Sequence, residues 1–83
     1  MITLDKLKDG MAAKIISVDG SGKFLSRMAA MGIVPGSVIE MVLSQKKYPF
    51  LIFVRDSIIA INCSDVEKIN VEMVERGNDP KTA

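Results

Sequence analysis

The sequence has 83 residues, which is enough for one modest hydrophobic core and excludes a multidomain architecture. Hydrophobic residues make up 48% and charged residues 25%, a composition that indicates a folded, soluble domain. Eleven Lys and Arg residues against ten Asp and Glu residues give a formal net charge of +1. This balance argues against nucleic-acid binding, because proteins that neutralise phosphates carry a marked basic surplus.

Cysteine content and the N-terminus indicate the compartment. Cys63 is the single cysteine, so no internal disulfide can form and a reducing environment is expected. Charged residues already appear at Asp5 and Lys6, unlike the apolar stretch of a signal peptide. The longest apolar runs, at positions 50–54 and 58–61, are too short to span a bilayer. We therefore expect a cytoplasmic protein without direct membrane insertion.

The first part of the chain predicts a short helical turn, a strand and a helix. The turn is expected over Thr3–Lys8, and the strand over Ala12–Val18, where β-branched residues favour extended backbone. Turn-forming residues then fill positions 19–22. Apolar residues recur at helical spacing over Lys23–Met31, and Gly32 directly after them suits a left-handed C-terminal cap.

From residue 34 onward the pattern is typical of β structure. Positions 34–37 match a type II turn, with Pro35 second and Gly36 third. A tight hairpin turn is predicted at Asp56-Ser57. The expected strands are Val38–Leu43, Phe50–Arg55, Ile58–Ile61 and Ile69–Val74.

The end of the chain predicts one more turn of helix and then a tail. Ser64 and Glu67 have the spacing of a capping box, so Ser64 is expected to cap this turn. Residues 75–83 have no apolar anchor and are predicted to be a disordered tail that follows a domain over residues 1–74. Five short strands with one inserted helix predict a mainly β fold, a small five-stranded β-barrel, because closure removes exposed strand edges.

Enzyme chemistry is difficult to build from this sequence. Histidine is absent, and with it the usual general base and the commonest metal ligand. Cys63 has no histidine to activate it, and positions 20–23 lack the spacing of a phosphate-binding loop. The sequence therefore predicts a protein that is not an enzyme and needs no cofactor.

A metal site is also not predicted, because closed transition-metal sites use several Cys or His side chains. Cys63 and Asp65 are only two positions apart, but we interpret the lone cysteine as a small buried hydrophobic residue. A weak metal site, or one shared between molecules, is left open.

Two groups of residues are candidates for partner contact. Met28 and Met31 belong to a set of six methionines that either fill gaps in the core, the favoured interpretation, or form an adaptable binding surface. Lys46, Lys47 and Tyr48 form a basic-aromatic tip between two strands. For this tip, a docking point and a solvated loop are equally supported.

The ordered set of motifs resembles the FeoA family. Leu4-x-x-Leu7-x-x-Gly10, an Ile/Val strand and Gly20-x-Gly22 before an amphipathic helix are similar to the start of a FeoA domain. The stretch Met31-Gly32-Ile33-Val34-Pro35-Gly36-Ser37-Val38-Ile39 is similar to the helix end and turn of that family, and the later strands follow in the same order. The resemblance covers about residues 2 to 74.

The resemblance implies an SH3-like barrel with an inserted helix and a cytoplasmic accessory role in ferrous iron uptake. The implied partner is the FeoB membrane permease or its GTP-binding cytoplasmic portion. A similar domain forms the C-terminal module of iron-dependent repressors of the DtxR type.

We expect partner contact in a cleft beside the helix, and its candidate residues are Arg27, Met28, Met31, Lys46, Lys47 and Tyr48. Binding would shift the permease between states by contacting one state better than another. The alternatives are a small barrel that binds nucleic acid and a repressor-type interaction domain. Self-association through exposed strand edges is a further hypothesis, so a homo-oligomer stays open.

Overall fold

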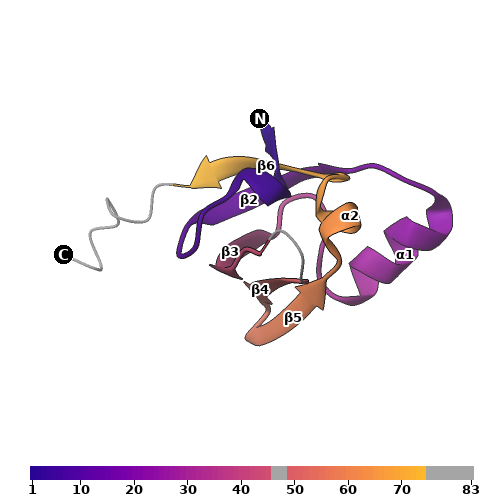
Figure 1. Cartoon of the computed structure of the whole chain (residues 1–83). Coiled ribbons are helices and arrows are strands. Elements are labelled where there is room, and N and C mark those ends of the chain that lie inside the picture. Colours follow the sequence, from indigo (N-terminus) through magenta and orange to yellow (C-terminus); the bar gives the residue numbers. More distant parts are fainter. Residues whose placement is uncertain (46–48, 75–83) are drawn as a thin grey trace.

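The computed structural model describes residues 1–45 and 49–74. These residues form one curved antiparallel sheet with a helix at one end (Figure 1). The strands are β1 (Ile2–Thr3), β2 (Ala12–Val18), β3 (Val38–Leu43), β4 (Phe50–Val54), β5 (Ser57–Ile61) and β6 (Ile69–Val74). The helices are the 3₁₀ helix η1 (Leu4–Lys6), α1 (Gly22–Ala30) and α2 (Cys63–Val66). The predicted tail and the basic-aromatic tip at 46–48 lie outside the described residues.

Within the described residues, the strand order is β1-β6-β2-β3-β4-β5 and every neighbouring pair is antiparallel. The expected mainly β fold with one inserted helix is confirmed, although the strand count is six rather than five. The additional strand, β1, has two residues and pairs Ile2 with Val71, a contact too short to leave a pattern in the sequence. Register shifts in β2 against β6 and in β3 against β4 bend the sheet, as β-bulges do.

The core lies inside the curve of the sheet and follows the two-residue period of the strands. In β4, for example, Phe50, Ile52 and Val54 are buried while Phe53 is exposed. Leu4 and Leu7 cover the core from the N-terminal turn. The preferred interpretation of the methionines agrees with the burial of Met28 and Met41 and the packing of Met11 and Met31 against the core; Met73 is exposed.

Helix α1 begins and ends through local chemistry. At its start the Phe24 N–H donates to the Ser21 Oγ at 3.2 Å, which satisfies one of the free donors of the first turn. At its end the Ile33 N–H donates to the Met28 carbonyl and the Gly32 N–H to the Ala29 carbonyl, the pair of bonds of a Schellman motif. Gly32 has a φ of 90°, so the predicted glycine cap is confirmed.

The type II turn at 34–37 is also confirmed. The Ser37 N–H donates to the Val34 carbonyl at 3.0 Å, and Gly36 at the third position has a φ of 96°. This turn leads directly from the end of α1 into β3 and holds the helix against the sheet, because the Gly36 N–H also donates to the Ile15 carbonyl of β2.

The hairpin prediction was wrong by one residue. The turn consists of Arg55 and Asp56, with φ of 52° and 63°, and Ser57 begins β5. Positive φ at both central residues is the type I′ geometry that matches the twist of the two strands. The resulting register places Ile61 opposite Phe50, and both side chains are buried.

Two predictions for the α2 region were also wrong. Asn62, not Ser64, is the N-cap of α2, and no side chain caps the helix; the Asn62 carbonyl accepts the Asp65 and Val66 N–H groups instead. Ser64 therefore lies inside the helix and the capping box does not form. Cys63 was expected to be buried but is exposed, because the helix begins at this residue with its side chain directed away from the core.

Candidate functional site: the groove between α1 and β5

A hollow of about 310 Å³ lies between α1, the end of β5 and the start of α2. We call it the α1–β5 groove. Its walls come from segments that are far apart in the sequence and lie side by side in the fold. The lining residues are Arg27, Met28, Ala30, Met31, Ala60, Ile61, Asn62 and Asp65.

The floor of the groove is apolar. Met28 is 1% exposed and Ile61 2% exposed, so both belong to the core and show only an edge to the groove. Met31 is half-buried and packs against the same core. Ala30 and Ala60, which both have small side chains, also line the groove, and this leaves the space open.

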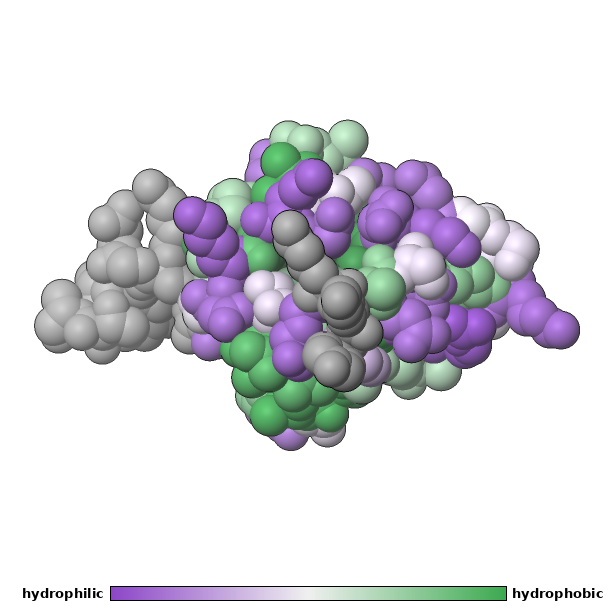
Figure 2. Space-filling model, in the orientation of Figure 1, coloured by the Kyte–Doolittle hydropathy of each residue, from purple (hydrophilic) through white to green (hydrophobic). Residues whose placement is uncertain are grey.

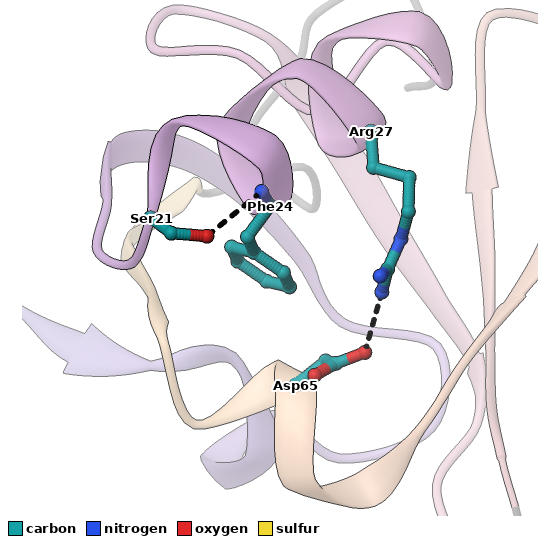
Figure 3. A network of polar contacts seen from close by, with 4 residues as sticks. All are labelled: Ser21, Phe24, Arg27 and Asp65. Carbon is teal, nitrogen blue, oxygen red and sulfur yellow. Dashed lines mark hydrogen bonds and ion pairs between the residues drawn. The ribbon is translucent and has the colours of Figure 1, made fainter.

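A charged pair closes one end of the groove. The Arg27 Nη2 lies 3.1 Å from the Asp65 Oδ2 and ties α1 to α2 (Figure 3). The Arg27 side chain is 60% exposed and that of Asp65 14% exposed, so the guanidinium is at the rim with donors to spare. Arg27 and Lys68 also lie over the Phe24 ring, at 5.5 Å and 4.8 Å from its centroid, within the range of cation–π contact.

A second arginine, Arg55, lies near the C-terminal end of α1. Its side chain lies against the C-terminal cap of α1, since a Cβ on Gly32 would lie 2.8 Å from the Arg55 Cδ. Arg55 is exposed, and within residues 1–45 and 49–74 its guanidinium has no ion-pair partner. Arg27, in the last turn of α1, and Arg55, against its C-terminal cap, therefore both lie toward the C-terminal end of the helix.

The structure brings together three of the six predicted site residues. Arg27, Met28 and Met31 line the α1–β5 groove, although Met28 contributes to its floor and not to an exposed surface. Lys46, Lys47 and Tyr48 fall outside the described residues. Partner contact by any of the six stays a prediction.

Sequence reasoning missed the residues that β5 and α2 supply to the groove. Ala60 is the one small residue among the isoleucines of β5, and this was the available signal for an open position. Asp65 gave no comparable signal, because its partner Arg27 is 38 positions away. Arg55 is exposed because it lies in the hairpin turn. The turn predicted from the sequence began one residue too late.

The described residues outside the groove offer fewer candidates for a functional site. In the described part of the chain, no three His, Cys, Asp or Glu side chains are arranged to hold a metal ion. None of the helices described is long and apolar enough to cross a membrane. Apolar side chains do gather where β4 and β5 lie, at the lower end of the molecule in Figure 2, with Phe53 40% and Ile58 60% exposed.

The architecture defines the class of protein. A small, strongly bent antiparallel sheet with one helix inserted between β2 and β3 is an SH3-like fold, as the resemblance implied. The sequence matches the model of the FeoA domain over residues 2–73, and the chain belongs to the FeoA family. This is a family of non-catalytic accessory proteins linked to ferrous iron transport, in agreement with the prediction that the chain is not an enzyme.

Solved structures share the fold. An iron uptake regulatory protein, FeoA, superposes with a TM-score of 0.84 at 20% identity, with 88% of this chain and 97% of that chain covered. FeoA from Stenotrophomonas maltophilia, an SH3 domain protein solved with zinc, has a TM-score of 0.73 at 24% identity over 87% of this chain and 90% of that one. The repressor IdeR from T. acidophilum has a TM-score of 0.77 at 20% identity, with 88% of this chain and 34% of that chain covered. The search of curated proteins found no significant match.

Proposed function

We propose that this chain is a cytoplasmic regulatory module of ferrous iron uptake that binds the FeoB permease, or its GTP-binding portion, through the α1–β5 groove. The observation that carries the proposal is that Arg27, Met28 and Met31 line one hollow with residues of β5 and α2. Family membership supplies the link to ferrous iron transport. The S. maltophilia relative is described as a candidate activating factor of ferrous iron transport, which supports a regulatory role.

The chemistry of the groove suits a protein partner. Interfaces derive most of their energy from a few anchors in desolvated pockets surrounded by a polar rim. Here the floor is formed by Met28 and Ile61, and the rim by Arg27, Asn62 and Asp65. Methionine adapts its shape to different partners, which suits contact with a permease that changes conformation.

Regulation then follows from differential affinity. If the groove contacts one state of FeoB better than another, binding shifts the permease toward that state by the difference in free energy. The domain over residues 1–74 is the binding module of this proposal. Lys46, Lys47 and Tyr48, the other predicted contact residues, are proposed to supply a second contact with the partner.

The experiment is a quantitative pull-down of purified FeoB with the full chain, with and without guanine nucleotide. Arg27→Glu and Met31→Asp are each expected to weaken binding about tenfold or more, because they change the rim and the half-buried wall of the groove. Lys23→Glu and Leu25→Asp are matched controls on the same helix, since both residues are exposed and neither lines the groove.

Two results would contradict the proposal. Wild-type affinity in both groove variants, with the fold intact by circular dichroism, would move the contact to another surface. Absence of FeoB binding together with tight, salt-sensitive binding of mixed oligonucleotides would favour the nucleic-acid alternative.

A further inference from the structure

The two edges of the sheet differ in how they are protected. β1 has two residues, and very short edge strands offer little backbone for pairing. β5 has five residues, and its sequence Ser-Ile-Ile-Ala-Ile contains no charge and no proline. Natural edge strands of this length are normally blunted by Lys, Pro or a bulge. The unprotected edge is the one that borders the α1–β5 groove.

The hairpin register identifies which backbone groups of β5 are free. In a two-residue hairpin the residues next to the turn, here Val54 and Ser57, exchange both hydrogen bonds. The alternation then directs the N–H and C=O groups of Ile59 and Ile61 toward β4, and those of Ile58 and Ala60 away from it. In the described residues, no other backbone group hydrogen-bonds to β5.

The groove beside this edge has the form of a strand site. Ala60 of β5 and Ala30 of α1 both line it and both have small side chains, so a third backbone can approach. Ile58, 60% exposed, offers an apolar neighbour to an added strand. Arg55 lies in the turn that precedes β5 and carries a charge with no ion-pair partner among the described residues.

We infer that β5 receives an extended peptide segment of the partner as an added strand in the α1–β5 groove. The segment has small apolar residues opposite Ile58 and Ala60 and a carboxylate that reaches Arg55. Main-chain bonds to the free groups of β5 supply affinity, and the side chains along the groove supply specificity, as in other cases of strand addition. The inference rests on the proposed function and specifies the way in which the permease is bound.

A second copy of this chain fits the site less well. Its β5 is attached to β4, so pairing would bring a whole sheet to the edge, whereas α1 stands beside this edge and leaves one hollow of about 310 Å³. A single strand from a partner needs only the spacing of one further strand, about 4.8 Å from β5.

The test is hydrogen exchange at single-residue resolution on the full chain, alone and bound to FeoB. In the free chain the amides of Ile58 and Ala60 exchange quickly, while those of Ile59 and Ile61 are already protected by β4. Binding is expected to slow exchange at Ile58 and Ala60 about tenfold or more, since each gains a hydrogen bond. This alternation would not arise from contact through side chains alone.

A backbone variant tests the same point. Ala60→Pro removes the outward N–H, and proline is tolerated at such a position of an edge strand. It is expected to weaken FeoB binding about tenfold, whereas Ala60→Ser, which changes the side chain and keeps the N–H, is expected to weaken binding clearly less. Arg55→Gln is expected to weaken binding about threefold to tenfold by removing the partner of the carboxylate.

The outcomes separate the two proposals. FeoB binding without protection of Ile58 and Ala60, and unchanged in Ala60→Pro, would overturn strand addition and leave the proposed function standing. Absence of FeoB binding in wild type would overturn both. Protection of Ile58 and Ala60 that grows with protein concentration and needs no FeoB would assign the edge to a second copy and overturn the inference.

Discussion

The inner face of helix α1 has two sides, one at the core and one at the groove, and the contrast between them separates stability from recognition. One side is buried against the sheet, with Phe24 5% and Met28 1% exposed. The neighbouring side of the same face borders the α1–β5 groove, where Arg27 is 60% exposed and Met31 is half-buried. Substitutions on the core side should therefore act on the free energy of unfolding, and those on the groove side on binding.

Substitution of Met28 should have the largest effect on stability, because this side chain belongs to the core. It also forms the floor of the groove. Met28→Ala is expected to lower the free energy of unfolding by about 2–5 kcal/mol, since it leaves a cavity in a close-packed core. Urea unfolding followed by circular dichroism measures the change. Met31→Ala is the comparison, with a smaller loss expected. Equal losses of stability in Met28→Ala and Met31→Ala would contradict the distinction between the core side and the groove side of α1.

Gly32 lies at the C-terminal end of α1, and its substitution is expected to have the next largest effect on the free energy of unfolding. Gly32→Ala should cost about 1–3 kcal/mol, because φ is +90° and the new Cβ would lie 2.8 Å from the Arg55 Cδ. Gly22→Ala is the control, since that site is open and has no positive φ. In an Arg55→Ala background the steric part of the loss should disappear, and an undiminished loss would assign all of it to the backbone.

Ser21 should have an intermediate effect that is confined to stability. Ser21→Ala removes the acceptor for the Phe24 N–H and is expected to lower the free energy of unfolding by about 1 kcal/mol. Thermal unfolding measures this change. Ser26→Ala, in the exposed middle of the same helix, is expected to be neutral. A change in FeoB affinity by Ser21→Ala at full folding would contradict the separation of the two sides.

The ion pair at the groove should have the smallest effect on stability. Asp65→Asn is expected to cost at most about 1 kcal/mol, since the Arg27 partner is mostly exposed and screened by solvent. High salt should reduce the difference in stability between Asp65→Asn and wild type. The same variant releases Arg27 at the rim, so FeoB affinity should change more than stability does. A larger loss of stability would contradict this prediction and show that the pair contributes more than an exposed ion pair does.

Local chemistry made much of the fold predictable. β2, β3 and β6 have the bounds expected from their apolar patterns, because β-branched residues at a two-residue period specify a half-buried strand. The glycine cap of α1 and the type II turn were also predictable, since a glycine at positive φ depends on a few neighbouring residues. The motif order was sufficient for the family, and the family for the SH3-like fold.

Predictions that depended on distant or subtle pairing were less successful. The hairpin turn was placed one residue too late because Arg55 has no composition signal for positive φ. The capping box at Ser64 was not formed because α2 begins at Cys63, which places Ser64 inside the helix. The second edge strand β1 was missed because its two residues gain their conformation from β6.

By itself, the sequence determined the class of fold, the helix, its cap and most strands, because each of these depends on residues close together in the chain. Tertiary structure alone decided the candidate site. Arg27 meets Asp65 across 38 positions, and Ala60 meets Ala30 across the groove, only after the sheet has curved and α1 has packed beside β5. A cleft forms where two segments face each other, and the periodicity of one segment does not show which other segment will face it.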